Sequence, residues 1–179
     1  MKRMWLVAVL LLWLAPVSMA GNPTVELRGI WVDAFHDGFK TPEQTTEMVN
    51  KVADANLNAI FVQVRKRGDA YYNSAIVPKA KDIAGDYDPL ADIIQKAHAR
   101  GIEVHAWLHL VEAWNTQYGE PPPGHVCADH PDWLTKLADG RQEWYEGRLF
   151  LDPGHPDVQA YLVAVVSEVA RRYAVDGIH

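Results

Sequence analysis

Short apolar, β-branched runs alternate with longer amphipathic stretches along most of this chain. The runs that predict β-strands are 27–33, 58–64, 102–110 and the beginning of a fourth at 175–179. The stretches with apolar residues at helical spacing are 41–56, 89–100 and 155–173. Thr41 before Pro42 and Asp88 before Pro89 are typical of helix starts, because a side-chain oxygen caps the helix and proline fits its first turn. The alternation predicts βα units with parallel strands.

The alternation of side chains within a strand distinguishes two architectures that such units can build. In the third strand Val104, Ala106 and Leu108 point one way, while His105 and Trp107 point the other. Central strands of an open doubly wound sheet are apolar on both faces, because helices cover both. One polar face therefore predicts an α/β fold of the (β/α)₈ TIM-barrel type, of which this sequence holds the first half, about four strands and three helices.

Polar side chains follow the predicted strands at their C-terminal ends. Asp33 ends the first strand, Gln63 and Arg65 end the second, and Trp107 and His109 end the third. Barrel enzymes assemble their sites from these strand ends and from the loops that follow them. A site is expected there. The stretch 111–148, with its Pro-Pro-Pro-Gly segment, is predicted as a long irregular loop, a kind of loop that is usually functional or disordered.

The first twenty residues have the features of a signal peptide. Lys2 and Arg3 precede a short apolar run, and Ser18-Met19-Ala20 supplies small residues for cleavage. The run is too short for a stable membrane helix, so we expect export after cleavage behind Ala20, no stable membrane span afterwards, and one mature unit over 21–179. The location is then secreted or periplasmic.

Composition argues against one kind of partner, nucleic acid, and against one source of stability, internal disulfides. The chain has 17 basic and 23 acidic side chains, a formal net charge of −6, and no basic stripe, so nucleic acid is not expected as a partner. A single cysteine, Cys127, excludes an internal disulfide framework.

Five motifs in order resemble one known family. They are LRGIWVD at 27–33, FVQVRKRGDAYY at 61–72, GIEVHAWL at 101–108, LDPG at 151–154 and VDGIH at 175–179. The chain resembles the glycosyl-hydrolase-like ten family, exported bacterial proteins with a (β/α)₈ barrel. The resemblance implies hydrolysis of O-glycosidic bonds in a polysaccharide or cell-envelope glycan by two carboxylates, without a cofactor. The chain departs from the family at His109-Leu110, where relatives carry asparagine and proline.

The resemblance also implies where the catalytic carboxylate belongs. In the family, an aspartate follows the fourth-strand motif just beyond the position of His179, so the catalytic residues stay unknown here. We expect residues 21–179 alone to be inactive, and the DNA beyond codon 179 to show whether the barrel continues.

Seven residues are candidates for contact with substrate. They are Asp33, Arg65, Asp69, His105, Trp107, His109 and His179. A guanidinium at a strand end can hold a carboxylate ionised and donate to sugar hydroxyls, histidines can hydrogen-bond hydroxyls, and an indole can stack on a sugar ring. The alternatives are that Asp33 caps the following loop, that Arg65 forms a structural salt bridge, that Asp69 pairs with a neighbouring cation, and that Trp107 belongs to the core.

Two other functions compete with hydrolysis by carboxylates. A metal hydrolase is disfavoured because His105 and His109 lie ~13 Å apart on a strand, beyond a shared ligand distance of ~2.1 Å. The set His125, Cys127 and His130 has better spacing but no fourth ligand, so no metal is expected. The second alternative is a non-catalytic carbohydrate-binding or scaffold module, with Trp107, Trp114, Trp133 and Trp144 as stacking platforms.

Overall fold

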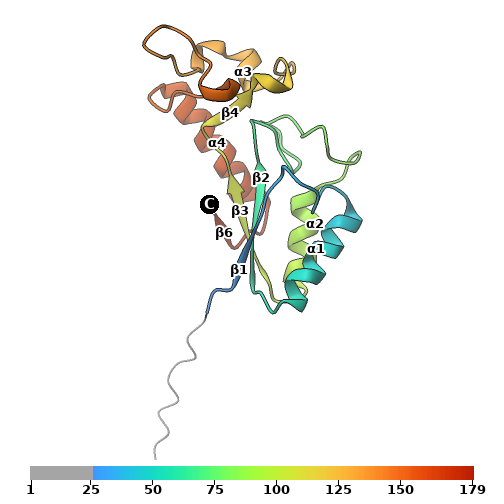
Figure 1. The fold of residues 1–179 in the computed structure, drawn as a ribbon. Helices are drawn as coiled ribbons and strands as arrows, with labels where there is room; N and C mark the ends of the chain where they lie inside the picture. Colours follow the sequence, from blue (N-terminus) through green and yellow to red (C-terminus); the bar gives the residue numbers. More distant parts are fainter. Residues whose placement is uncertain (1–25) are drawn as a thin grey trace, which may run out of the picture.

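Four parallel strands form the central sheet of this protein (Figure 1). The computed structural model describes residues 26–179, so the predicted signal peptide lies outside the described residues. The strands are β1 (Gly29–Val32), β2 (Ala59–Arg65), β3 (Glu103–Leu108) and β6 (Gly177–Ile178). They are paired in the order β1-β2-β3-β6. The predicted strands are confirmed. Three of them are shorter than the sequence suggested, and β2 keeps its predicted length but is shifted by one residue. Their order is that of successive strands in a barrel wall.

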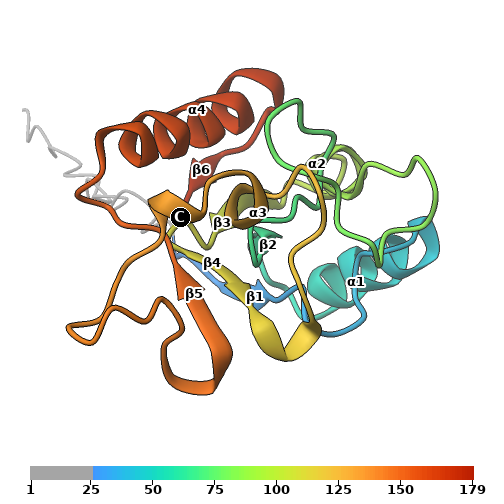
Figure 2. The same cartoon turned by 90° about the horizontal axis from the view of Figure 1, so that it is seen from above.

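Three long helices cross between these strands. They are α1 (Pro42–Asp54), α2 (Pro89–His98) and α4 (Pro156–Arg172), and they follow one another around the same side of the sheet (Figure 2). Thr41 caps α1 by accepting from the Gln44 backbone N–H at 3.3 Å, and Asp88 caps α2 by accepting from that of Ala91 at 3.1 Å. The helix starts predicted from Thr41 and Asp88 are confirmed.

The two faces of the sheet differ as the alternation of side chains predicts. Val62, Val104 and Ala106 are fully buried under the helices. On the opposite, concave face Trp31 keeps 51% of its surface exposed, and Trp107 is half-buried. Helices on one face only identify a barrel wall and exclude a doubly wound sheet for the described residues.

A β-bulge interrupts the alternation near the end of β2. Gln63 is paired with Trp107, but the next pair is Arg65 with Leu108, so Val64 is the extra residue. Leu108 belongs to the helix-covered core, and Arg65 beyond the bulge lies on that side too, 6.0 Å from the ring of Tyr161 in α4. The expectation that Arg65 shares the concave face with Gln63 is therefore wrong.

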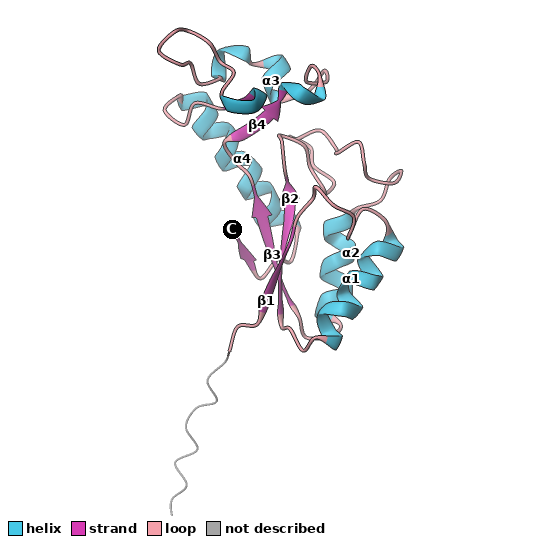
Figure 3. Cartoon of the chain, viewed as in Figure 1, coloured by secondary structure: helices cyan, strands magenta, loops and turns pink. Residues whose placement is uncertain are grey.

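The stretch predicted as an irregular loop contains short helical and strand segments (Figure 3), and two of its strands form a small second sheet (Figure 2). Strands β4 (Glu112–Asn115) and β5 (Arg148–Phe150) pair antiparallel. Between them lie α3 (Val126–Asp129) and 3₁₀ turns at Thr116–Tyr118, Pro131–Trp133 and Tyr145–Gly147. We call residues 111–151 the insertion. It has its own apolar cluster around Ala113, Val126 and Leu151, and strands of three or four residues are too short for a readable alternation.

Between residues 26 and 179, no helix combines the length and the apolar character needed to cross a bilayer.

Candidate functional site

Aromatic and imidazole rings gather on the concave face of the sheet. Phe61 stacks on Trp31 at 4.7 Å between ring centroids, and His105 stacks on Phe61 at the same distance. Trp107 meets Trp31 edge-on at 5.1 Å, and His179 does so at 4.6 Å. Three predicted site residues, His105, Trp107 and His179, are thus brought together on one surface. Trp31 and Phe61 are additional members that the strand alternation places beside them.

Glycine in β6 makes room for the His105 ring. A Cβ built on Gly177 would collide with the imidazole of His105, which is paired across to β6 at this position. The His105 Nε2 also lies 3.1 Å from the Glu103 carboxylate. The stack on Phe61, the Glu103 contact and Gly177 together fix the orientation of this ring.

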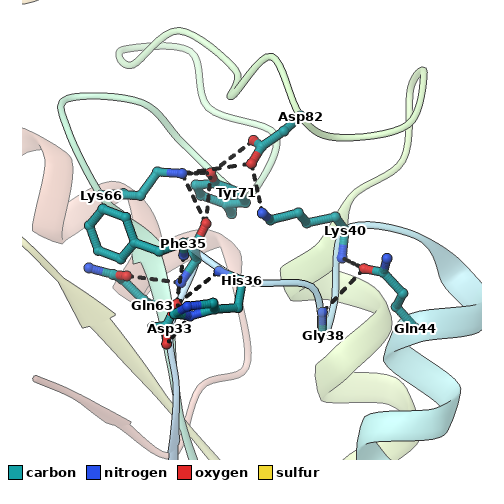
Figure 4. A network of polar contacts seen from close by, with 11 residues as sticks. Asp33, Phe35, His36, Gly38, Lys40, Gln44, Gln63, Lys66, Tyr71 and Asp82 are labelled. Carbon is teal, nitrogen blue, oxygen red and sulfur yellow. Dashed lines mark hydrogen bonds and ion pairs between the residues drawn. The ribbon is translucent and has the colours of Figure 1, made fainter. Parts of the chain in front are cut away.

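Asp33 lies directly after β1 and organises the loop that follows (Figure 4). Its Oδ1 accepts from the backbone N–H groups of Phe35 at 2.7 Å and His36 at 3.0 Å, and both carboxylate oxygens lie 3.0 Å from His36 Nδ1. Partial burial raises the pKa of Asp33, but the His36 and backbone hydrogen bonds lower it more, so the pKa falls below its ordinary value. Asp33 is an ionised carboxylate that caps its own loop.

A polar network, buried except at Asp82, joins the ends of β1 and β2 (Figure 4). Gln63 Oε1 accepts from the Ala34 N–H at 2.9 Å, and Lys66 Nζ donates to the Ala34 carbonyl at 2.9 Å and to the Tyr71 hydroxyl. Asp82 accepts from Tyr71 at 2.8 Å and lies 3.7 Å from Lys66 Nζ. Sequence reasoning missed Lys66 and Asp82 as site-forming residues. The Arg-Lys-Arg run after β2 was the available signal for Lys66, whereas nothing in the sequence links Asp82 to it.

Arg65 is fully buried at the root of the insertion. Its Nη1 donates to the carbonyls of His109 and, at 3.0 Å, Leu110. Among residues 26–179 it forms no ion pair, and its Nε and Nη2 have no acceptor. The guanidinium therefore holds the chain between β3 and β4, away from the concave face.

His109 completes this junction from the other side. Its backbone N–H donates to the Arg65 carbonyl at 3.0 Å, and its ring meets Trp107 edge-on at 5.1 Å. Burial lowers the pKa of His109, Glu112 opposes this, and the Arg65 charge adds to it. His109 is therefore neutral near pH 7 and links the Arg65 junction to the concave face.

Asp69 lies in a separate hollow of about 270 Å³ between the loop after β2 and the insertion. Its Oδ1 accepts from the Arg67 backbone N–H at 3.0 Å. In the described part of the chain it makes no ion pair with the neighbouring cations. We call this hollow, lined by Lys66, Arg67, Asp69, Lys79, Lys81, Asp82, Trp114, Tyr118, Pro122 and His125, the cationic hollow.

The histidine and cysteine set of the insertion is engaged in the fold. His125 is fully buried, its Nε2 lies 2.8 Å from the Arg67 carbonyl, and its Nδ1 accepts from the Cys127 N–H at 3.2 Å. Both ring nitrogens are thus used. Within 26–179 no three His, Cys, Asp or Glu side chains are grouped as a metal site would require.

A parallel sheet with helices around one side and polar groups at the C-terminal strand ends defines the TIM-barrel class of α/β proteins. Solved structures agree. A hypothetical protein from Ruminiclostridium thermocellum matches with a TM-score of 0.62 and 17% identity, over 83% of this chain and 73% of that one. The α-galactosidase AgaA of Geobacillus stearothermophilus matches with a TM-score of 0.59 and 15% identity, over 85% of this chain and 21% of that one.

The chain belongs to the glycosyl hydrolase-like 10 family, whose model matches residues 26–179. It is 31% identical to the glycosyl hydrolase DigH of Escherichia coli over 186 aligned positions, which cover 93% of this chain and 40% of that protein. It is 28% identical to the glycosyl hydrolase YngK of Bacillus subtilis, over 86% of this chain and 32% of that protein. The chain therefore spans about a third to two fifths of the length of these relatives, and the family resemblance carried by the five motifs is confirmed.

Proposed function

We propose that this chain forms the glycan-binding first half of an exported glycoside hydrolase that cleaves O-glycosidic bonds of a polysaccharide without a cofactor. The concave face carries the proposal. Trp31, Phe61 and Trp107 offer apolar ring surfaces beside the imidazoles of His105 and His179. Sugars present apolar ring faces edged by hydroxyls, so stacking surfaces next to hydrogen-bonding groups suit them. The family membership supports the same class of substrate.

Asp33 is proposed as an acceptor and not as the acid of the reaction. Glycosidic cleavage uses one protonated carboxyl and one carboxylate, ~5.5 Å apart for retention and further for inversion. The lowered pKa of Asp33 keeps it ionised, so it suits hydrogen bonds from sugar hydroxyls or a stabilising charge. We propose that the catalytic pair of the whole protein comes from outside the four described strands.

Each of the other candidate residues has a stated role in this proposal. His105, Trp107 and His179 contact the substrate directly from the concave face. Arg65 and His109 position the insertion relative to that face, because Arg65 is enclosed and donates to the His109 carbonyl. Asp69 belongs to the cationic hollow.

Export is part of the proposal. We propose cleavage behind Ala20 and a substrate in the cell envelope or the medium. N-terminal sequencing of the protein recovered from the periplasm or medium of an expressing cell tests this. A first residue of Gly21 is expected, whereas an intact N-terminus at Met1 in the cytoplasm would contradict it.

The test of hydrolysis is release of reducing ends from a panel of polysaccharides. The protein isolated from its native cells, in whatever length it occurs, is compared with recombinant 21–179. We expect turnover by the native protein and none by 21–179. The four strands of 21–179 leave the concave face open, and the two carboxylates that would flank the glycosidic bond are proposed to lie outside these strands. Turnover by 21–179 contradicts the proposed location of the carboxylates, and no turnover by the native protein on any glycan contradicts the proposed reaction.

A second candidate function is that of a non-catalytic carbohydrate-binding module. Exposed aromatic rings on the insertion favour it. Trp144 is 43% exposed and Tyr145 is 79% exposed, whereas the Trp133 ring is covered by His130 at 3.9 Å. Measuring glycan binding by the variants Trp107→Ala and Trp144→Ala distinguishes the two candidate functions. Loss of affinity in Trp107→Ala alone supports the concave face, and loss in Trp144→Ala alone supports the module.

A further inference from the structure

The cationic hollow concentrates positive charge in an acidic protein. Its lining holds Lys66, Arg67, Lys79 and Lys81 against two carboxylates, whereas the whole chain has a net charge of −6. Asp82 is already engaged, since its carboxylate lies 2.8 Å from Lys40 Nζ and accepts from the Tyr71 hydroxyl. The lysines and Arg67 therefore exceed the carboxylates available to neutralise them.

Arg67 is the least satisfied of these cations. Its guanidinium lies 3.8 Å from the ring centroid of Tyr118 in the insertion and 5.5 Å from that of Phe35 after β1. These contacts use the faces of the guanidinium. Its N–H groups have no acceptor among residues 26–179, although Nε and Nη1 are closed to solvent. Enclosed donors without acceptors are rare in folded proteins, and they indicate a place where an acceptor is missing.

The surroundings of Arg67 hold the hollow open. Gly68, next to Arg67, adopts a positive φ of +74°. Burial lowers the pKa of the adjacent His125, so its ring resists protonation. The Trp114 indole donates to the Gly119 carbonyl at 2.8 Å, which fixes one aromatic wall. A volume of about 270 Å³ is enough for one small ring or acid group and not for a polymer.

We propose that the cationic hollow binds the acid group of an acidic sugar unit, with Arg67 as the main donor, Lys79 and Lys81 as supporting charges, and Tyr118 beside the ring. A guanidinium presents paired N–H donors to a carboxylate, sulfate or phosphate, and aromatic walls suit a sugar ring. The carbohydrate part of this inference rests on the proposed function, whereas the anion part rests on the hollow alone. Lys66 and Arg67 of the hollow directly follow β2, and their cations lie 5.2 Å and 5.5 Å from the ring of Phe35, in the loop after β1.

The test is calorimetric binding of a carboxylated oligosaccharide, oligogalacturonate, to recombinant 21–179. The same oligosaccharide with its carboxylates methyl-esterified and a sulfated neutral oligosaccharide are the comparison ligands. We expect the esterified form to bind at least about tenfold more weakly, and inorganic sulfate and phosphate to compete weakly. If the sulfated ligand binds as tightly as the carboxylated one, the hollow recognises negative charge in general. If the carboxylated ligand binds more tightly, the hollow recognises the planar carboxylate.

Variants locate the binding. Arg67→Gln is expected to weaken oligogalacturonate binding at least about tenfold, and Arg171→Gln, the same change on an α4 residue outside the hollow, is expected to leave it unchanged. Should Arg67→Gln fail to fold, the pair Lys79→Gln and Lys81→Gln gives the same comparison, because Lys81 is exposed and Lys79 is only half-buried. Equal binding of the esterified and acidic ligands, or unchanged binding in both sets of variants, overturns the proposal.

The two proposals fail in different ways. Cleavage of glycans by the native protein with no preference for acid groups in binding contradicts the hollow alone. Binding of acidic saccharides through Arg67 without cleavage of any glycan contradicts hydrolysis alone.

Discussion

At the scale of single residues, Asp33 couples its charge to the loop after β1. Its pKa in the folded protein lies below the ordinary value, so ionisation of Asp33 stabilises the fold. This contribution is fully present above the pKa of the unfolded chain, near 4, and is lost as the pH falls through the folded pKa. The side chain is 38% exposed, so solvent screening keeps the effect small.

The first prediction follows from this sign. Asp33→Asn keeps an acceptor oxygen but removes the charge, so it should lower the free energy of unfolding at pH 7 by less than about 1 kcal/mol. As the pH falls through the folded pKa of Asp33, the difference between the variant and the wild type should shrink. Urea unfolding at several pH values measures this, and a difference that stays constant with pH would show that the charge is irrelevant.

Gly68 is a second residue whose surroundings limit which side chain its position can accept. It has a φ of +74°, and an added Cβ would meet the His125 ring and, at 3.0 Å, the Ala113 carbonyl. Gly124 also has a positive φ, +80°, but an added Cβ there would meet nothing within 4 Å. Backbone strain for alanine is common to both positions, and steric overlap belongs only to Gly68.

The second prediction compares these two glycines. Gly124→Ala should lower the free energy of unfolding by about 1 kcal/mol, the cost of alanine in the left-handed region. Gly68→Ala should cost about 1–3 kcal/mol more, because the buried His125 ring has to move. Chemical denaturation of both variants checks this, and equal losses would mean that the loop after β2 yields easily.

The strand alternation predicted His105, Trp107 and His179 on one face, because side chains in a regular strand change sides at every residue. It misplaced Arg65, since a bulge at Val64 shifts the register and no residue of the sequence Val62 to Arg65 marks a bulge. Lys66 contacts Asp82 and Arg67 contacts Tyr118 only because the loop after β2 and the insertion fold back towards the end of β2. Such contacts are tertiary, so no local pattern could have predicted them.

At the scale of elements, the N-terminus of α2 is bound to the end of α4. Asp88 Oδ1 caps α2, while its Oδ2 accepts from the Tyr173 hydroxyl at 2.7 Å. Thr41 caps α1 and forms a single side-chain bond to Gln44. Both caps were predicted from sequence because a capping oxygen before proline is a local signal. The Tyr173 contact, 85 residues away, was not.

The third prediction compares the two caps. Thr41→Ala should lower the free energy of unfolding by about 1 kcal/mol, the usual cost of a lost N-cap. Asp88→Ala should cost about 2–3 kcal/mol, because it also removes the 2.7 Å hydrogen bond from the Tyr173 hydroxyl, which then keeps only its 3.3 Å contact with the Asn73 carbonyl. Tyr173→Phe combined with Asp88→Ala should cost less than the two single losses together, and strict additivity in the denaturation data would exclude the coupling.

At the scale of the whole molecule, the described sheet has two open edges, β1 and β6, and an aromatic concave face. Open strand edges and exposed apolar surface favour pairing between chains. The three helices cover the other face. The part of the molecule best suited to bind a glycan is therefore also the part most prone to self-association.

The fourth prediction concerns this association. Purified 21–179 should associate as its concentration rises, and Trp31→Glu should weaken the association because it places a charge on the concave face. Val163→Glu, which changes a valine that is 66% exposed on α4, should have no effect. Sedimentation velocity over a range of concentrations measures both, and equal effects of the two variants would place the contact elsewhere.

The insertion and the barrel wall have separate apolar clusters, and the cationic hollow lies between them. Lys66, Arg67 and Lys81 come from the loop after β2, whereas Trp114 and Tyr118 come from the insertion. Divergence of the insertion can therefore reshape one wall of this pocket while the strands and helices keep their packing. In evolutionary terms, ligand preference in this protein is free to change faster than its fold.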